Sequence, residues 1–130
     1  MERIEEVTYL DTHVVVWLYD GESQKLSREA AEQIKNDALF ISPTVLLELE
    51  FLREIHKLTK TSQAMVRSLS AEIGLSVCDL PFAAVIDCAL AEKWVRDPFD
   101  RLIVAHASAN NAPLITKDEK IRRHYKRAIW

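Results

Sequence analysis

Strand-like and helix-like segments alternate along the whole chain, and this alternation restricts its fold more than any other feature. Short β-branched, aromatic or apolar runs predict strands at 7–10, 39–41, 75–78, 114–116 and 128–130. Between them, helical periodicity and turn signals predict helices at 14–18, 27–36, 43–58, 62–73, 81–94, 98–109 and 119–125. Strands separated by helices predict an α/β fold with a mainly parallel sheet, joined by right-handed crossovers and covered on both faces.

Capping residues predict where several of these helices begin and end. Ser27, Ser42 and Asp97 each stand where a side-chain oxygen can accept a free backbone N–H, and proline follows both Ser42 and Asp97. Gly74 is suited to the left-handed conformation that ends a helix at Ile73.

Length and composition predict a single folded domain over 1–130. The chain has 130 residues, of which 48% are hydrophobic, so it can bury a substantial core. Its two glycines, Gly21 and Gly74, lie too far apart to build a phosphate-binding glycine loop. Cys78 and Cys88 form neither a C-x-x-C pair nor part of a Cys/His set, which argues against a disulfide or a zinc site.

Hydropathy predicts a cytoplasmic protein without a membrane span. The longest apolar runs, such as 14–18 and 102–105, are far shorter than the roughly 20 residues that a spanning helix needs. The opening residues 1–6 do not have the pattern of a secretion signal.

The formal net charge of −3 hides an uneven distribution. Residues 117–130 carry six Lys and Arg against two Asp and Glu, a net +4, which leaves −7 on the rest of the chain. A basic segment on an acidic body allows local contact with a polyanion, although a solvated helix face explains the same pattern.

Carboxylates follow two of the predicted strands at the end where α/β sheets bind ligands. Asp11 comes directly after strand 7–10, and Asp118 follows strand 114–116 after one residue. Ligands of open parallel sheets bind outside the carboxyl ends of the strands, so both side chains are candidates for a site.

Glu48 falls within an apolar face of its predicted helix. At about 100° per residue, Val45, Phe51, Leu52 and Ile55 lie within about 60° of it, whereas Glu50 lies on the charged side and is assigned no role. A carboxylate on a buried face needs either a cation or a hydrogen-bonded core environment, and both interpretations stay open.

Asp97 and Asp100 begin the helix at 98–109. Helix capping explains Asp97. The apolar run 102–105 predicts that this helix is buried, with Asp100 in its first turn facing the same crevice as Asp11.

Asp11, Glu48, Asp100 and Asp118 would thus converge at one end of the sheet. Carboxylates placed together raise one another's pKa unless a cation neutralises them, and Mg²⁺ or Mn²⁺ prefers such oxygen ligands. An ion of this kind polarises a phosphoryl oxygen and activates water, which indicates metal-assisted hydrolysis of phosphodiesters.

Four segments in order resemble the PIN-domain family, and more narrowly the VapC-type toxins of toxin–antitoxin pairs. They are Tyr9-Leu10-Asp11-Thr12-His13, Ile41-Ser42-Pro43 leading to Leu47-Glu48-Leu49, Arg96-Asp97-Pro98-Phe99-Asp100-Arg101-Leu102-Ile103, and Leu114-Ile115-Thr116-Lys117-Asp118, with Ile129-Trp130 at the end. One departure is Leu47, where many relatives have tryptophan.

The resemblance implies a three-layer α/β/α fold and a ribonuclease. Asp11, Glu48, Asp100 and Asp118 would form its Mg²⁺ or Mn²⁺ site, with Thr12, Ser42, Thr116 and Asp97 as neighbours that orient carboxylates or water. It further implies an RNA substrate, homodimerisation, and a small antitoxin that blocks the site.

Several other residues have weaker claims. Arg101 and Lys117 are candidate RNA contacts, although Arg101 can equally pair with Asp97 or another acid. His13 is expected at the rim of the site, and Trp17, Trp94 and Trp130 are expected in the core or a dimer contact rather than under RNA bases.

Other functions compete with the nuclease. A non-catalytic PIN-like module acting through a protein partner would need none of the four acids. A haloacid-dehalogenase-like phosphatase needs a second aspartate where His13 stands, and a receiver domain, with Asp79 as the acceptor, lacks its paired acids near Asp11.

Overall fold

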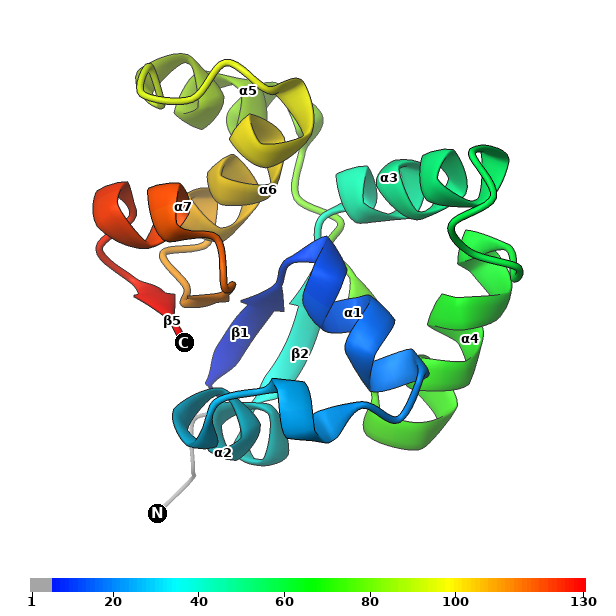
Figure 1. The fold of residues 1–130 in the computed structure, drawn as a ribbon. Helices are drawn as coiled ribbons and strands as arrows, with labels where there is room; N and C mark the ends of the chain where they lie inside the picture. Colours follow the sequence, from blue (N-terminus) through cyan, green and yellow to red (C-terminus); the bar gives the residue numbers. More distant parts are fainter. Residues whose placement is uncertain (1–5) are drawn as a thin grey trace.

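The protein forms one parallel sheet of five strands with the order β3-β2-β1-β4-β5 (Figure 1). The computed structural model describes residues 6–130, so the prediction drawn from the opening segment lies, apart from Glu6, outside the described residues. The strands are β1 (Val7–Leu10), β2 (Ala38–Ile41), β3 (Ser76–Val77), β4 (Leu114–Ile115) and β5 (Ala128–Ile129). Every neighbouring pair is parallel, which confirms the predicted sheet.

Helices connect the strands and flank the sheet. They are α1 (Thr12–Tyr19), α2 (Arg28–Asn36), α3 (Pro43–Glu54), α4 (Ser62–Ile73), α5 (Phe82–Ala91), α6 (Pro98–Ala109) and α7 (Glu119–His124), with a short 3₁₀ turn, η1, at Ser23–Lys25. The chain moves outward from β1 to β3 and then returns across the sheet to β4. Right-handed crossovers therefore put α1 to α4 on one face and α5 to α7 on the other, which is the expected three-layer arrangement.

The predicted caps stand where the sequence indicated. Ser27 accepts the N–H of Ala30 at 3.0 Å, and Ser42 accepts the N–H of Thr44 at 3.0 Å. Gly74 ends α4 with φ at +70°. Each of these contacts satisfies a helix-terminal group from a residue close in sequence, so local pattern sufficed to place it.

Two helices are shorter than predicted. Helix α3 ends at Glu54 rather than at residue 58. His56 adopts a φ of 64° there, and the N–H groups of His56 and Lys57 donate to the carbonyls of Arg53 and Leu52. This is the double hydrogen bond of a Schellman end, formed without the glycine that would have announced it.

Helix α5 ends at Ala91 rather than at Trp94. The Arg101 guanidinium donates to the carbonyl of Ala89 at 2.7 Å and to that of Leu90 at 3.4 Å. Carbonyls in the last turn of α5 are therefore satisfied by a side chain from α6, a partner twelve residues away.

The face of α3 around Glu48 is less buried than the periodicity predicted. Val45 is fully buried, but Phe51 is 49% exposed and Ile55 is 44% exposed. The helical wheel correctly groups these side chains on one face, but only the turn nearest the sheet is covered by neighbouring elements.

The core lies between the central strands and the helices packed on them. Strands β1 and β4 supply Leu10, Leu114 and Ile115. In the middle of α6, Ile103, Val104 and Ala105 are buried, as predicted for the run 102–105, and Leu102 is partly buried. Within residues 6–130, no helix combines the length and apolar character needed to cross a membrane.

Candidate active site

The sheet reverses its direction of growth between β1 and β4, and this is where the acidic residues gather. β1 has β2 on one side and β4 on the other. The connections that leave the carboxyl ends of β1 and β4 therefore run in opposite directions along the sheet. Such a switch point leaves a crevice in which α/β proteins bind ligands. Asp11 lies directly after β1, and Thr116 lies directly after β4.

Asp11 is held firmly in this crevice. Its side chain caps α1 by accepting the N–H of Thr12 at 2.8 Å, and its second oxygen accepts the hydroxyl of Thr116 at 2.6 Å. The residue is only 4% exposed. The carboxylate therefore has a defined orientation. It is set by the N–H of the next residue, Thr12, and by the hydroxyl of Thr116 at the end of the neighbouring strand.

Thr116 also connects Asp11 to Asp118. Its hydroxyl oxygen accepts the N–H of Asp118 at 3.0 Å, while Asp118 caps α7 by accepting the N–H of Ile121 at 2.9 Å. A single threonine at the end of β4 thus positions two of the predicted acids.

Glu48 reaches the same crevice from α3. The Thr12 hydroxyl donates a hydrogen bond to its carboxylate. Burial raises the pKa of Glu48 and the charge of Asp11 raises it further, whereas the bond from Thr12 lowers it. Glu48 is therefore hydrogen-bonded, and it lies near the like-charged Asp11.

Asp100 completes the set from the first turn of α6. Burial, followed by the charges of Asp11, Asp97, Asp118 and Glu48, raises the pKa of Asp100 to about 7. The other three predicted acids all contribute to this shift, so the four carboxylates share one electrostatic environment.

The four acids line one cavity of about 340 Å³, which we call the acidic cavity. His13 and Trp17 of α1 also line it, as does Lys57 beyond the end of α3. The sequence prediction did not include Lys57, because its position depends on the Schellman end at His56. Trp17 had a detectable signal, since it lies four residues after His13 and therefore on the same side of α1.

The chemistry of this donor set fits a hard divalent cation. Within residues 6–130, no three His, Cys, Asp or Glu side chains are arranged to hold an ion as they stand. Mg²⁺ does not require such a cage, since it keeps several waters and is bound through one or two carboxylates plus substrate phosphates. Four acids around one cavity provide oxygen ligands, and burial and the neighbouring carboxylates raise the pKa of Asp100 to about 7.

Three further residues named from the sequence make contacts with neighbouring helices or helix ends. Ser42 was expected to orient carboxylates or water, but its hydroxyl forms a 2.7 Å hydrogen bond with Nδ1 of His106. Asp97 caps α6 by accepting the N–H of Asp100 at 3.1 Å, as helix capping predicts. Arg101 is engaged with α5 and, among the described residues, forms no ion pair with Asp97.

His13 lies at the rim, as expected. Its Nε2 accepts the N–H of Lys117 at 2.9 Å, and its Nδ1 lies 3.7 Å from Asp11 Oδ2. Burial lowers the pKa of His13, and its Nε2 must be unprotonated to accept that bond. The neutral ring therefore holds the loop that carries Asp118. The side chain of Lys117 is exposed beside it.

Solved structures share this fold over nearly its full length. The VapBC2 complex of Rickettsia felis bound to a promoter DNA fragment matches with a TM-score of 0.66 and 20% identity, covering 95% of this chain and 97% of that one. A toxin–antitoxin complex from Klebsiella pneumoniae matches with a TM-score of 0.65 and 18% identity, covering 95% and 96%.

Sequence comparison extends the likeness to the family. Ribonuclease VapC22 of Mycobacterium tuberculosis is 34% identical over 121 residues, which cover 88% of this chain and 89% of that protein. The family model of the PIN domain matches residues 8–127. The chain therefore belongs to the PIN-domain family.

Proposed function

We propose that the protein is a Mg²⁺- or Mn²⁺-dependent endoribonuclease, acting as the toxin of a toxin–antitoxin pair within a single domain over 1–130. The observation that carries this proposal is the acidic cavity, where Asp11, Glu48, Asp100 and Asp118 converge at the switch point of the sheet. The similar protein from M. tuberculosis is named a ribonuclease, which supports RNA as the substrate.

The four carboxylates would hold the cation. The positively charged Lys57, which lines the same cavity, would contact the negatively charged phosphate. When bound, a divalent cation polarises a phosphoryl oxygen and lowers the pKa of an attacking water. Thr12 and Thr116 hold the Glu48 and Asp11 carboxylates in place, so that these oxygens need not reorganise when substrate enters.

A small antitoxin protein is the proposed partner, and the cytoplasm is the proposed location. The structural relatives from R. felis and K. pneumoniae were solved as complexes of toxins with antitoxins. On this chain, Leu47, Phe51 and Ile55 are exposed along α3, and such apolar side chains suit protein contacts, either with the antitoxin or in a homodimer.

Cleavage of RNA by wild-type protein and by Asp11→Asn tests the proposed activity. A mixed pool of structured and single-stranded RNAs is incubated with each protein in Mg²⁺, Mn²⁺ or EDTA. We expect wild-type protein to cut only with a metal ion and Asp11→Asn to cut at least about 100-fold more slowly, because it removes a carboxylate that two hydrogen bonds orient.

Copurified antitoxin must be excluded by mass spectrometry, and metal binding must be confirmed by calorimetry. If antitoxin-free protein binds metal and cuts none of these RNAs, or if Asp11→Asn cuts as fast as wild type, the nuclease proposal is wrong. A non-catalytic module that acts through a protein partner is then the better description.

A further inference from the structure

Three aromatic side chains form a continuous cluster next to the acidic cavity, and we call it the aromatic ridge. The ring centroids of His13 and Trp17 lie 5.0 Å apart, those of Trp17 and Trp130 lie 5.8 Å apart, and those of His13 and Trp130 lie 6.5 Å apart. All three residues are only partly buried. The ridge joins α1 to the strand β5 and therefore spans two sides of the site.

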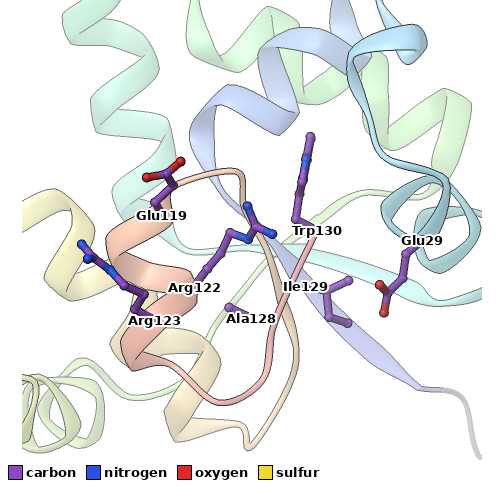
Figure 2. A pocket seen from close by; sticks show the side chains of 7 residues that line it. All are labelled: Glu29, Glu119, Arg122, Arg123, Ala128, Ile129 and Trp130. Atoms are coloured by element: carbon purple, nitrogen blue, oxygen red, sulfur yellow. The ribbon is translucent and has the colours of Figure 1, made fainter.

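The aromatic ridge separates two cavities. His13 and Trp17 line the acidic cavity, while Trp130 lines a second cavity of about 530 Å³. This second space, the arginine cavity, is bounded by Arg122, Arg123 and Glu119 of α7 and by Glu29 of α2. Figure 2 shows the Arg122 side chain extending from α7 toward the ring of Trp130, with Arg123 pointing to the other side.

Basic side chains lie along the aromatic ridge, outside the acidic cavity. Four carboxylates line the acidic cavity, so it repels RNA phosphates that are not matched by a cation. Beside it, the amines of Lys25 and Lys117 lie 5.7 and 6.0 Å from the ring centroid of Trp17. Beyond the ridge, Arg122 and Arg123 belong to the segment 117–130 with its net +4. A polyanion bound at the acidic cavity gains its favourable contacts along this path.

We propose that the aromatic ridge and the arginine cavity bind an unpaired nucleotide of the RNA next to the phosphate being cut, with its base stacked on Trp130 and its phosphate held by Arg122. This inference rests on the proposed function, because it assigns the position of the substrate around that same site. A stacked base needs a free face, which a base inside a duplex does not offer. The nucleotide held at this position is therefore unpaired.

Binding is measured with the Asp11→Asn variant in EDTA, so that neither cleavage nor metal affects the result. The probe is a single-stranded oligoribonucleotide that carries one 2-aminopurine, whose fluorescence falls when the base stacks. We expect quenching on binding to the single strand and none with the same sequence in a duplex. Adding Trp130→Leu should weaken binding about 5- to 150-fold, the range for loss of one base–aromatic stack.

Trp94 provides the matched control. It stacks on His124 with ring centroids 4.7 Å apart and lines neither cavity. We expect Trp94→Leu to bind the probe as tightly as its parent. Trp130 also packs against the core, so urea unfolding must show that Trp130→Leu is folded at the assay temperature.

Arg122→Gln keeps the test decisive even if Trp130→Leu does not fold. Arg122 is exposed on α7, so its replacement leaves the core intact. If its guanidinium contacts a phosphate, the slope of log affinity against log salt becomes shallower by about 1. An unchanged slope together with unquenched 2-aminopurine overturns the proposal.

The activity of wild-type protein separates failure of this inference from failure of the proposed nuclease. If the protein cuts RNA and Trp130→Leu, introduced alone, raises neither KM nor the dissociation constant, the ridge is only a packing contact and the inference is wrong. If the protein does not cut but quenches the probe in a Trp130-dependent way, the nuclease proposal fails and the binding site stands. If Trp130→Leu instead abolishes binding of the antitoxin and leaves RNA affinity unchanged, the ridge is a protein contact and the inference is wrong.

Discussion

Helices α3 and α6 face each other at two places, six residues apart along each helix, and these two places have opposite chemistry. At one, Ser42 and His106 are 1% and 2% exposed and share a 2.7 Å hydrogen bond. At the other, Glu48 and Asp100 line the acidic cavity, and burial and neighbouring negative charges raise the pKa of each. Six helical residues correspond to about 9 Å, so an attractive contact and a repulsive one lie less than two turns apart.

The difference shows how a fold can hold like charges together. The neutral, buried pair ties the two helices at the protected end. At the open end Glu48 accepts the Thr12 hydroxyl and lies near the like-charged Asp100. We therefore expect substitutions at Ser42 and His106 to change stability, and substitutions at Glu48 and Asp100 to change activity. Four measurements can break or sharpen this division.

The largest effect is expected at Glu48. Glu48→Gln keeps the size of the side chain and removes a charge from the cavity, so cleavage should fall by about 100-fold or more without loss of stability. Glu50 on the same helix is the control, since it accepts the N–H of Ser62 at 2.9 Å and pairs with Arg53 on the surface. Glu50→Gln should leave the cleavage rate unchanged, and equal losses in the two variants would contradict the assignment of Glu48.

His106→Phe should act on stability. It keeps a buried ring but leaves the Ser42 hydroxyl without its partner, at a cost of about 1–3 kcal/mol in the free energy of unfolding measured by urea denaturation. Burial lowers the pKa of His106, so the unfolded chain binds its proton more readily and wild-type stability should fall as pH drops below 6.5. The phenylalanine variant should lose this part of the pH dependence. Its cleavage rate per folded molecule should stay within about twofold, and a tenfold loss would show that the tie also positions the acids.

Thr12→Val tests the hydroxyl that holds Glu48. The two side chains have nearly the same shape, so we expect cleavage to fall about tenfold, the lower end for loss of a group that orients a metal ligand. Thr8 provides the control. Its hydroxyl donates a 2.6 Å hydrogen bond to Asp37, and Thr8 does not line the acidic cavity. Thr8→Val should reduce stability but not the cleavage rate of the folded protein. Equal rates for wild type and Thr12→Val would remove Thr12 from the site.

The smallest effect is expected in the pH dependence of stability near Asp100. Its pKa rises from 3.8 to about 7 in the folded protein, so ionisation favours unfolding and stability should decrease as pH rises through this window. Asp100 is partly open to solvent, which limits the effect to about 1 kcal/mol. In EDTA at pH 8, Asp100→Asn should unfold at a higher urea concentration than wild type, while at pH 4 the two should agree. A less stable Asn variant at pH 8 would show that the charge is already compensated.

Local sequence signals were sufficient to predict most of the fold, but not every helix end or the exposure of every side chain. Ser27, Ser42, Asp97 and Gly74 each complete a helix end through contacts within a few residues, so their positions could be predicted. The Schellman end at His56 could not, because no glycine marks it. The early end of α5 depends on Arg101, and the exposure of Phe51 and Ile55 depends on what the rest of the chain leaves uncovered.

The convergence of the four acids could be predicted because Asp11 and Asp118 follow strands closely, while Glu48 and Asp100 stand beside apolar runs on their helices. Their fine arrangement could not, since it depends on contacts between distant residues. Thr116 lies 105 positions from Asp11, and His106 lies 64 positions from Ser42. The family resemblance implied that Ser42 orients a carboxylate or a bound water. Only the packing of α3 against α6 shows that this hydroxyl serves the helix contact.

The central position of β1 also determines when the activity can arise during synthesis. β1 pairs with β4 only after more than a hundred residues have been made, with Leu10 opposite Ile115. Asp11 leaves the ribosome long before the threonine that orients it and Asp118, because Thr116 follows Asp11 by 105 residues. A prematurely terminated chain that stops before β4 therefore has most of the helices and no complete site. The acidic cavity therefore forms only when strands from both ends of the sheet's connectivity have paired.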